Sequence, residues 1–116
     1  MNEARRSLHL SDELLVAYSR RGNFHSDPHA AARLGYAGLV AQGMQSVGPV
    51  YGLLLDEWGD DFLAHGELEI TFVGLVVGGD TIDAAVEFVD DETAQITVTI
   101  ARTDRTAVVG HARRRA

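Results

Sequence analysis

The residues best suited to chemistry lie between Asn23 and Trp58. Histidine is the side chain whose ordinary pKa lies near neutral pH, and His25 stands just before a helix start, so it is a candidate general acid or base. Gly43 opens an apolar run, and at a helix start its backbone N–H would be unpaired and suited to an oxygen that gains negative charge. The plainer alternatives are a histidine that only hydrogen-bonds its own loop and a glycine that only permits a tight turn.

Two polar residues flank this histidine. Asp27 precedes Pro28, and Asp-Pro is typical of a helix start, so we interpret Asp27 as a helix cap rather than as the acid of a dyad with His25. The short helix that follows should end at Gly35. Asn23 could orient a water or a ligand, or cap the loop, and both interpretations stay open.

The stretch Gly43–Trp58 predicts a long helix that is covered on most sides. Apolar residues recur at helical spacing and no charge occurs before Asp56. These apolar residues are Met44, Val47, Val50, Tyr51, Leu54, Leu55 and Trp58. Pro49 removes one helical hydrogen bond, so we expect a kink, or a helix that is regular only after it.

The C-terminal half predicts a sheet. Apolar and polar residues alternate over 67–72, 81–88, 95–100 and 106–113, which is the period of half-buried strands. Short turns between these runs predict an antiparallel meander with one apolar face, and this face should cover the apolar helix.

The remaining segments are predicted from local signals. We expect Met1–Arg6 to be loose, Ser7–Leu10 to form a short strand, and Ser11 to cap a short helix. Gly59–Asp61 should form a turn between the long helix and the first strand of the sheet.

Composition narrows the functional classes. A chain of 116 residues predicts one domain, 1–116. It has no cysteine and no lysine, which excludes disulfides, thiolate chemistry and a Schiff-base lysine. The net charge of −7 disfavours a nucleic-acid partner. No apolar run is long enough to span a membrane, and no histidines have metal-site spacing, so we expect a cytoplasmic protein without a metal or cofactor.

Two stretches together carry a family resemblance. The first is His-Ser-Asp-Pro-His-Ala-Ala-Ala-Arg-Leu-Gly-Tyr-Ala-Gly-Leu-Val-Ala-Gln-Gly-Met (25–44), and the second is Ile-Thr-Phe-Val-Gly-Leu-Val-Val-Gly-Gly-Asp-Thr (70–81). In this order they resemble the MaoC-like hydratases and dehydratases, and the likeness spans about Leu8 to Ala112. The resemblance implies an α+β hot-dog fold, in which an antiparallel sheet wraps a central helix. It also implies an acyl-thioester substrate carried by coenzyme A or an acyl carrier protein.

The resemblance also implies roles for individual residues. His25 would be the acid–base group, the Gly43 N–H the oxyanion donor and Asn23 a third catalytic residue, while Gln42 and Met44 would contact the substrate. The family usually carries an aspartate before the histidine, in a run like Gly-Asp-x-Asn-Pro-x-His. Here that position falls on Arg20 or Arg21. An arginine can bind an anionic ligand group but stays protonated and cannot act as a base.

Three functions remain in competition. The leading interpretation is a hydratase or dehydratase with an altered acid–base set. The second is a thioesterase or another tailoring reaction on an acyl or polyketide intermediate. The third is a non-catalytic hot-dog subunit that completes a partner's site. A chain this small exposes sheet edges, and hot-dog proteins usually join two sheets, so we expect a homodimer or a hetero-oligomer with another hot-dog subunit.

Overall fold

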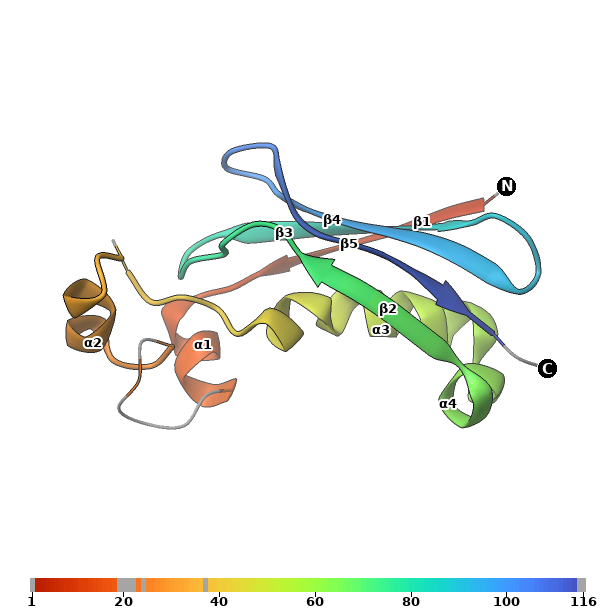
Figure 1. Cartoon of the computed structure of the whole chain (residues 1–116), viewed down its shortest axis with the longest axis horizontal. Coiled ribbons are helices and arrows are strands. Elements are labelled where there is room, and N and C mark those ends of the chain that lie inside the picture. Colours follow the sequence, from red (N-terminus) through yellow and green to blue (C-terminus); the bar gives the residue numbers. More distant parts are fainter. Residues whose placement is uncertain (1, 19–22, 24, 37, 115–116) are drawn as a thin grey trace.

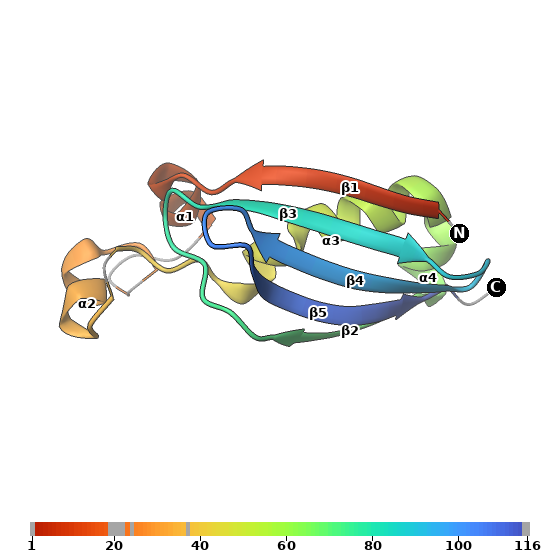
Figure 2. The same cartoon turned by 90° about the horizontal axis from the view of Figure 1, so that it is seen from above.

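A computed structural model describes residues 2–18, 23, 25–36 and 38–114 of the chain. Within this part, five antiparallel strands form one sheet in the order β1-β3-β4-β5-β2 (Figure 2). The strands are β1 (Asn2–His9), β2 (Glu67–Phe72), β3 (Thr81–Phe88), β4 (Thr93–Ile100) and β5 (Arg105–Arg113).

The helices of the described chain are α1 (Asp12–Tyr18), α2 (Pro28–Arg33), α3 (Gly43–Trp58) and α4 (Asp60–His65). The long α3 runs along one face of the sheet, with α1 and α2 beyond its N-terminal end and α4 at its C-terminal end (Figure 1). This arrangement confirms the predicted α+β architecture, in which an antiparallel sheet packs on a central helix.

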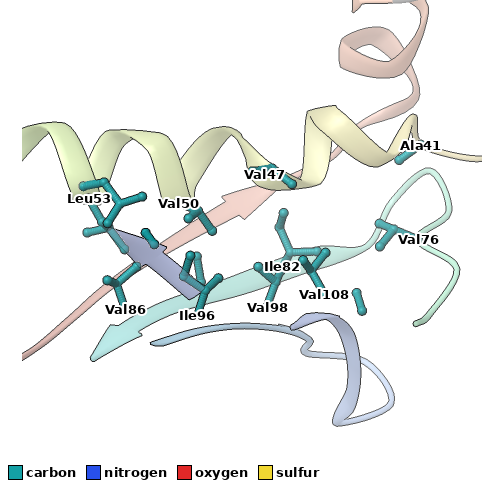
Figure 3. Packing of buried hydrophobic residues seen from close by; sticks show 14 of the residues in the cluster. Ala41, Val47, Val50, Leu53, Val76, Ile82, Val86, Ile96, Val98 and Val108 are labelled. Carbon is teal, nitrogen blue, oxygen red and sulfur yellow. The ribbon is translucent and has the colours of Figure 1, made fainter. Parts of the chain in front are cut away.

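The core forms between α3 and the inner face of the sheet. Burial alternates strictly along β3, and the inward residues of β3 and β4 are apolar. Val47, Val50 and Leu53 of α3 point at these strands (Figure 3). Burying an aliphatic side chain of this size contributes about 1.5–3 kcal/mol, so this interface supplies much of the driving force for folding.

The central helix has the predicted bounds. It is helical from Gly43, before Pro49, so the expected alternative of a helix that is regular only after the proline is wrong. The buried contacts of Val47 and Val50 lie on either side of Pro49 and hold the backbone in place. Its exposed residues are Met44, Gly48, Asp56 and Glu57, and the others are buried or partly buried, so the helix is covered on most sides, as predicted.

The N-terminal strand is longer than predicted. Asn2–His9 pairs with β3 over its whole length, from Asn2 opposite Phe88 to His9 opposite Thr81. Its side chains are mostly exposed and polar, so the apolar alternation that marks the other strands is absent. Backbone pairing along β3 orders this edge strand instead, which local sequence patterns do not reveal.

The segment after α3 is a helix rather than the expected simple turn. Gly59, with a φ of 60°, ends α3 and also precedes the first residue of α4. Phe62 of α4 is buried against Trp58, with ring centroids 5.9 Å apart. This aromatic contact explains why the acidic Gly-Asp-Asp signal opens a helical turn.

The predicted meander is correct for β3, β4 and β5 and wrong for β2. This strand pairs with β5, at the opposite side of the sheet from β1, and residues 73–80 cross over from it to β3. The short turn predicted between β2 and β3 contains the Gly78–Gly79 pair. Its N–H groups instead donate to Leu39 and Leu10, so the turn is bound by two other segments of the chain.

Candidate active site

His25 is held in a defined orientation by its neighbours. Its backbone N–H donates to Asn23 Oδ1 at 2.9 Å, and its ring Nδ1 lies 2.6 Å from the carbonyl oxygen of Val40. A carbonyl oxygen can only accept, so Nδ1 must carry the hydrogen. In the neutral imidazole the lone pair is then on Nε2, which is the nitrogen able to take a proton from a ligand.

A short ladder fixes the carbonyl that binds this ring. Val40 pairs with Val77 in an isolated antiparallel bridge. On either side of it, Ala41 N–H donates to the Val76 carbonyl at 2.8 Å and Gly78 N–H donates to the Leu39 carbonyl at 2.8 Å. The chain before α3 is therefore tied to the crossover that leaves β2.

Asp80 stabilises the segment of this ladder that contains Val77. Its buried carboxylate accepts the Val77 N–H at 3.0 Å and pairs with Arg102, whose Nε lies 2.7 Å from Oδ1. The Arg102 guanidinium lowers the pKa of Asp80; burial opposes that shift, and the Val77 N–H adds to it. The Gly-Asp-Thr stretch, noticed in the sequence only as a family mark, thus supports the histidine through Val77 and Val40.

His25 lines a pocket of about 570 Å³ at the start of α3. Most of the other described residues around it are apolar or glycine. The lining consists of His25, Tyr36, Val40, Ala41, Gln42, Gly43, Met44, Ser46, Phe72, Gly74, Leu75, Val76, Ala107 and Val108. The structure therefore brings together the predicted residues His25, Gln42, Gly43 and Met44, and adds residues from the end of β2 and the start of β5.

The N-terminus of α3 forms part of the pocket wall. Gln42 precedes the helix with extended backbone and provides no side-chain cap. In the described chain the N–H of Gly43 has no protein acceptor, as expected for the first residue of a helix. A Cβ on Gly43 would lie 2.8 Å from two carbons of the Phe72 ring, so the ring packs directly on this end of the helix.

Asn23 and Asp27 act as caps. Besides the His25 N–H, Asn23 Oδ1 accepts a bond from Ser26 Oγ at 3.4 Å, and Asn23 is not among the described residues that line the pocket. Asp27 Oδ1 accepts the His29 N–H at 2.9 Å, which confirms its interpretation as the cap of α2. Arg20 and Arg21 lie outside the described residues.

Sequence reasoning missed several residues of this site. Tyr36, Ser46 and Val108 line the pocket, but no chemical signal near His25 indicated them. Val108 enters because β5 lies between β4 and β2, a neighbour relation that the meander prediction had wrong. Phe72 was noticed as part of the second motif, although its contact with Gly43 requires the folded chain.

The sequence match extends over most of this structure. The family model described as the MaoC like domain matches residues 3–109. The chain therefore belongs to the MaoC-like domain family, as the two motifs predicted. No curated protein matches the chain.

Solved structures with the same architecture include bacterial hydratases. The unliganded R-hydratase PhaJ1 from Pseudomonas aeruginosa is 18% identical, with a TM-score of 0.76 over 97% of this chain and 77% of that one. An (R)-hydratase from A. caviae involved in PHA biosynthesis is 22% identical, with a TM-score of 0.70 over 96% of this chain and 91% of that one.

A two-subunit enzyme is also similar. A chain of the C-terminally truncated HadBC complex from Mycobacterium tuberculosis, a 3R-hydroxyacyl-ACP dehydratase, is 19% identical with a TM-score of 0.69, covering 96% of this chain and 92% of that one. At these identities the matches establish the fold, and the predicted hot-dog fold is confirmed. Within the described residues, no helix is long and apolar enough to cross a membrane.

Proposed function

We propose that this protein is an acyl-thioester hydratase or dehydratase whose acid–base set is altered. One observation carries the proposal: the ring of His25, oriented by the Val40 carbonyl, lines the same pocket as the first residue of α3, Gly43. A general base and an unpaired N–H at a helix start are the two groups that hydration of an enoyl thioester requires most. Membership of the MaoC-like domain family supports the same reaction.

The reaction follows from these two groups. The Gly43 N–H binds the thioester carbonyl, whose oxygen becomes negative when water adds to C3. His25 Nε2 takes a proton from the attacking water as the C3–O bond forms. The resulting imidazolium returns that proton to C2, and the carbonyl is restored. One imidazole performs both transfers, and the reverse sequence is the dehydration. A positioned acid–base group of this kind contributes about 10²–10⁴ in rate.

The remaining predicted residues have supporting roles in this proposal. Gln42 and Met44 line the pocket and would contact the substrate. Asn23 would act by holding the backbone of His25, since its side-chain oxygen accepts that N–H. Arg20 and Arg21, one of which falls on the family's aspartate position, would place a cation near an anionic group of the ligand.

The pocket's location favours a dimer. β2 is an edge strand, and the exposed apolar side chains of Phe72 and Val73 stand at its end beside the pocket, with 49% and 55% of their surfaces accessible. Exposed edges and apolar patches of this kind favour pairing with another sheet. We therefore propose a homodimer joined along β2, or a hetero-oligomer with another hot-dog subunit.

A panel of thioesters tests the function. The protein is incubated with 2-enoyl, 3-hydroxyacyl and saturated acyl thioesters, each carried on coenzyme A and on an acyl carrier protein, and the products are separated. Addition or loss of water supports the proposal. Release of free thiol instead identifies a thioesterase. Inactivity on every substrate, followed by activity after a second hot-dog subunit is added, identifies the subunit that completes a partner's site.

A further inference from the structure

Ser46 places a hydroxyl in the wall of this pocket. It lies in the first turn of α3, is only 3% exposed and lines the pocket together with His25 and Gly43. Within the described part of the chain, its hydroxyl makes no hydrogen bond. In that part of the chain, two side-chain atoms are fully buried and have no hydrogen-bond partner, one in Gln45 and one in Arg114. The Ser46 oxygen is not one of them, so it is open to the pocket.

This state is unusual for a buried serine. A serine within a helix commonly bonds back to the carbonyl four residues earlier, which here would be that of Gln42. Nearly all buried polar groups in proteins have some partner, protein or water. A hydroxyl that faces a pocket walled by Val76 and Val108 therefore has its hydrogen-bonding capacity available to whatever occupies the pocket.

The depth of Ser46 indicates which part of a ligand it meets. Gly43 and Ser46 are three residues apart on one face of α3, about 4.5 Å along the helix axis. Met44, between them, is 47% exposed at the pocket mouth, whereas Ser46 is 3% exposed. If the thioester carbonyl accepts the Gly43 N–H and the carrier of the thioester stays outside the pocket, the acyl chain runs inward. C3 is two bonds from the carbonyl carbon and therefore lies toward Ser46.

We infer that the Ser46 hydroxyl binds the oxygen on C3 of the substrate, so that this pocket recognises 3-hydroxyacyl thioesters in preference to saturated ones. The inference rests on the proposed function. A serine hydroxyl stays protonated at neutral pH and does not replace the missing carboxylate as a base. It holds the water that attacks C3, or the hydroxyl that leaves, while His25 moves the proton. Ser46 is thus a substrate-binding residue of the site.

Two substitutions at Ser46 separate the role of its hydroxyl from the role of its small size. A small residue lets α3 approach the sheet, and alanine would preserve that packing and favour the helix slightly. Ser46→Ala therefore removes the hydroxyl and retains the fold. Ser46→Cys keeps the shape of the side chain, with a slightly larger atom and only a weak donor, and it provides a second variant.

The test measures binding without turnover. In a His25→Ala background, the affinities of a 3-hydroxyacyl-CoA and of the saturated acyl-CoA of equal chain length are measured by calorimetry. Ser46→Ala is expected to weaken the hydroxyacyl ligand about two- to tenfold, the net effect of one hydrogen bond, and to leave the saturated ligand unchanged. Ser46→Cys should shift in the same direction. Ser7→Ala, which removes a hydroxyl bonded to Asp83 far from the pocket, should change neither affinity.

Each outcome decides between the claims. If both ligands bind and Ser46→Ala weakens neither or both equally, the role of Ser46 is wrong and the hydratase proposal stands. If neither ligand binds before Ser46 is changed, the proposed function fails and the role of Ser46 fails with it.

Discussion

Val40 and Val77 form an antiparallel bridge that joins the two sequence motifs of this chain. The Val40 carbonyl accepts the hydrogen on Nδ1 of His25, and the Val77 N–H donates to the buried Asp80. The aspartate of the second motif and the histidine of the first are therefore connected through two backbone groups. This connection gives a structural reason for the two motifs to occur together.

Asp80→Asn should reduce both stability and activity. The substitution removes the charge that pairs with Arg102 and replaces one of the two accepting oxygens by a donor, and losing a hydrogen bond to a charged group costs about 1.5–3 kcal/mol. Because the Val77 turn supports the Val40 carbonyl, kcat should fall several-fold at temperatures where the variant is folded. Urea unfolding and steady-state kinetics measure the two effects.

The pH dependence supplies a second readout and a control. Arg102 holds the pKa of Asp80 below its unfolded value of about 4, so the carboxylate stabilises the fold above pH 4 and this contribution is lost as pH falls through the lowered pKa. Asp80→Asn should flatten that acid dependence. Asp90 also has a lowered pKa, from the N–H groups of Glu92 and Thr93, but caps a distant turn. Asp90→Asn should alter acid stability without affecting kcat; an equal loss of kcat would contradict the connection.

Gly43→Ala should impair the site through Phe72. The added methyl would meet the Phe72 ring at 2.8 Å, and overpacking of this kind costs about 1–3 kcal/mol when neighbours cannot move. The ring is half exposed and can swing away, so we expect a small loss of stability and a fall of about tenfold or more in kcat/KM from the displaced pocket wall.

A double-mutant cycle isolates this contact. Gly43→Ala combined with Phe72→Ala relieves the clash and keeps the backbone N–H, so the double variant should be more active than the sum of the single effects predicts. Strictly additive effects would show that the ring does not limit the space at Gly43.

Gly48 inside α3 and Gly59 directly after it should respond oppositely to alanine. A Cβ at either Gly48 or Gly59 meets nothing within 4 Å, so space does not distinguish them. Gly48 has a helical conformation, and Gly48→Ala should stabilise the chain by about 0.5–1 kcal/mol. Gly59 ends the helix at φ 60°, ψ −140°, a region that glycine alone adopts readily, and Gly59→Ala should destabilise it by about 1–3 kcal/mol. Thermal unfolding of both variants tests this contrast, and effects of the same sign would contradict it.

The proposed dimer predicts a localised effect of charge. Val73→Asp places a carboxylate in the apolar surface beside the β2 edge and should convert dimers into monomers in sedimentation at micromolar concentration. Leu63 is 70% exposed on α4 and gives a matched control, since Leu63→Asp should leave the dimer intact. A parent protein that sediments as a monomer would contradict the proposal.

Much of the architecture could be predicted because local sequence patterns determine it. The helix Gly43–Trp58, the cap at Asp27 and the alternation along β3 follow from helical spacing, side-chain chemistry and period two. The polar strand β1 could not be predicted, since its order comes from backbone bonds to β3, over seventy residues away. The crossover after β2 could not be predicted either, because Gly78–Gly79 has the sequence of an ordinary hairpin turn and its actual partners, Leu39 and Leu10, are distant in the chain.

The site was predictable only in part. His25 and Gly43 could be proposed because their local contexts suggest a chemical role, and both line the same pocket. Val40 contributes a backbone carbonyl, and every residue type has one, so its side chain gives no signal. Ser46 belongs to the site because it lines the pocket, which only the folded chain forms. The link from Asp80 to His25 depends on the pairing of residues 39–41 with 76–78, a long-range contact outside any periodic pattern.

The hydration rate of an enoyl-CoA, compared between the parent protein and His25→Ala, tests the central claim most directly. His29 is exposed on α2 and outside the pocket, so His29→Ala controls for the loss of an imidazole elsewhere. We predict that His25→Ala lowers kcat by about a hundredfold or more with the fold intact, because in the proposed mechanism one imidazole performs both proton transfers, and that His29→Ala retains parental activity. Full activity in folded His25→Ala would contradict the account.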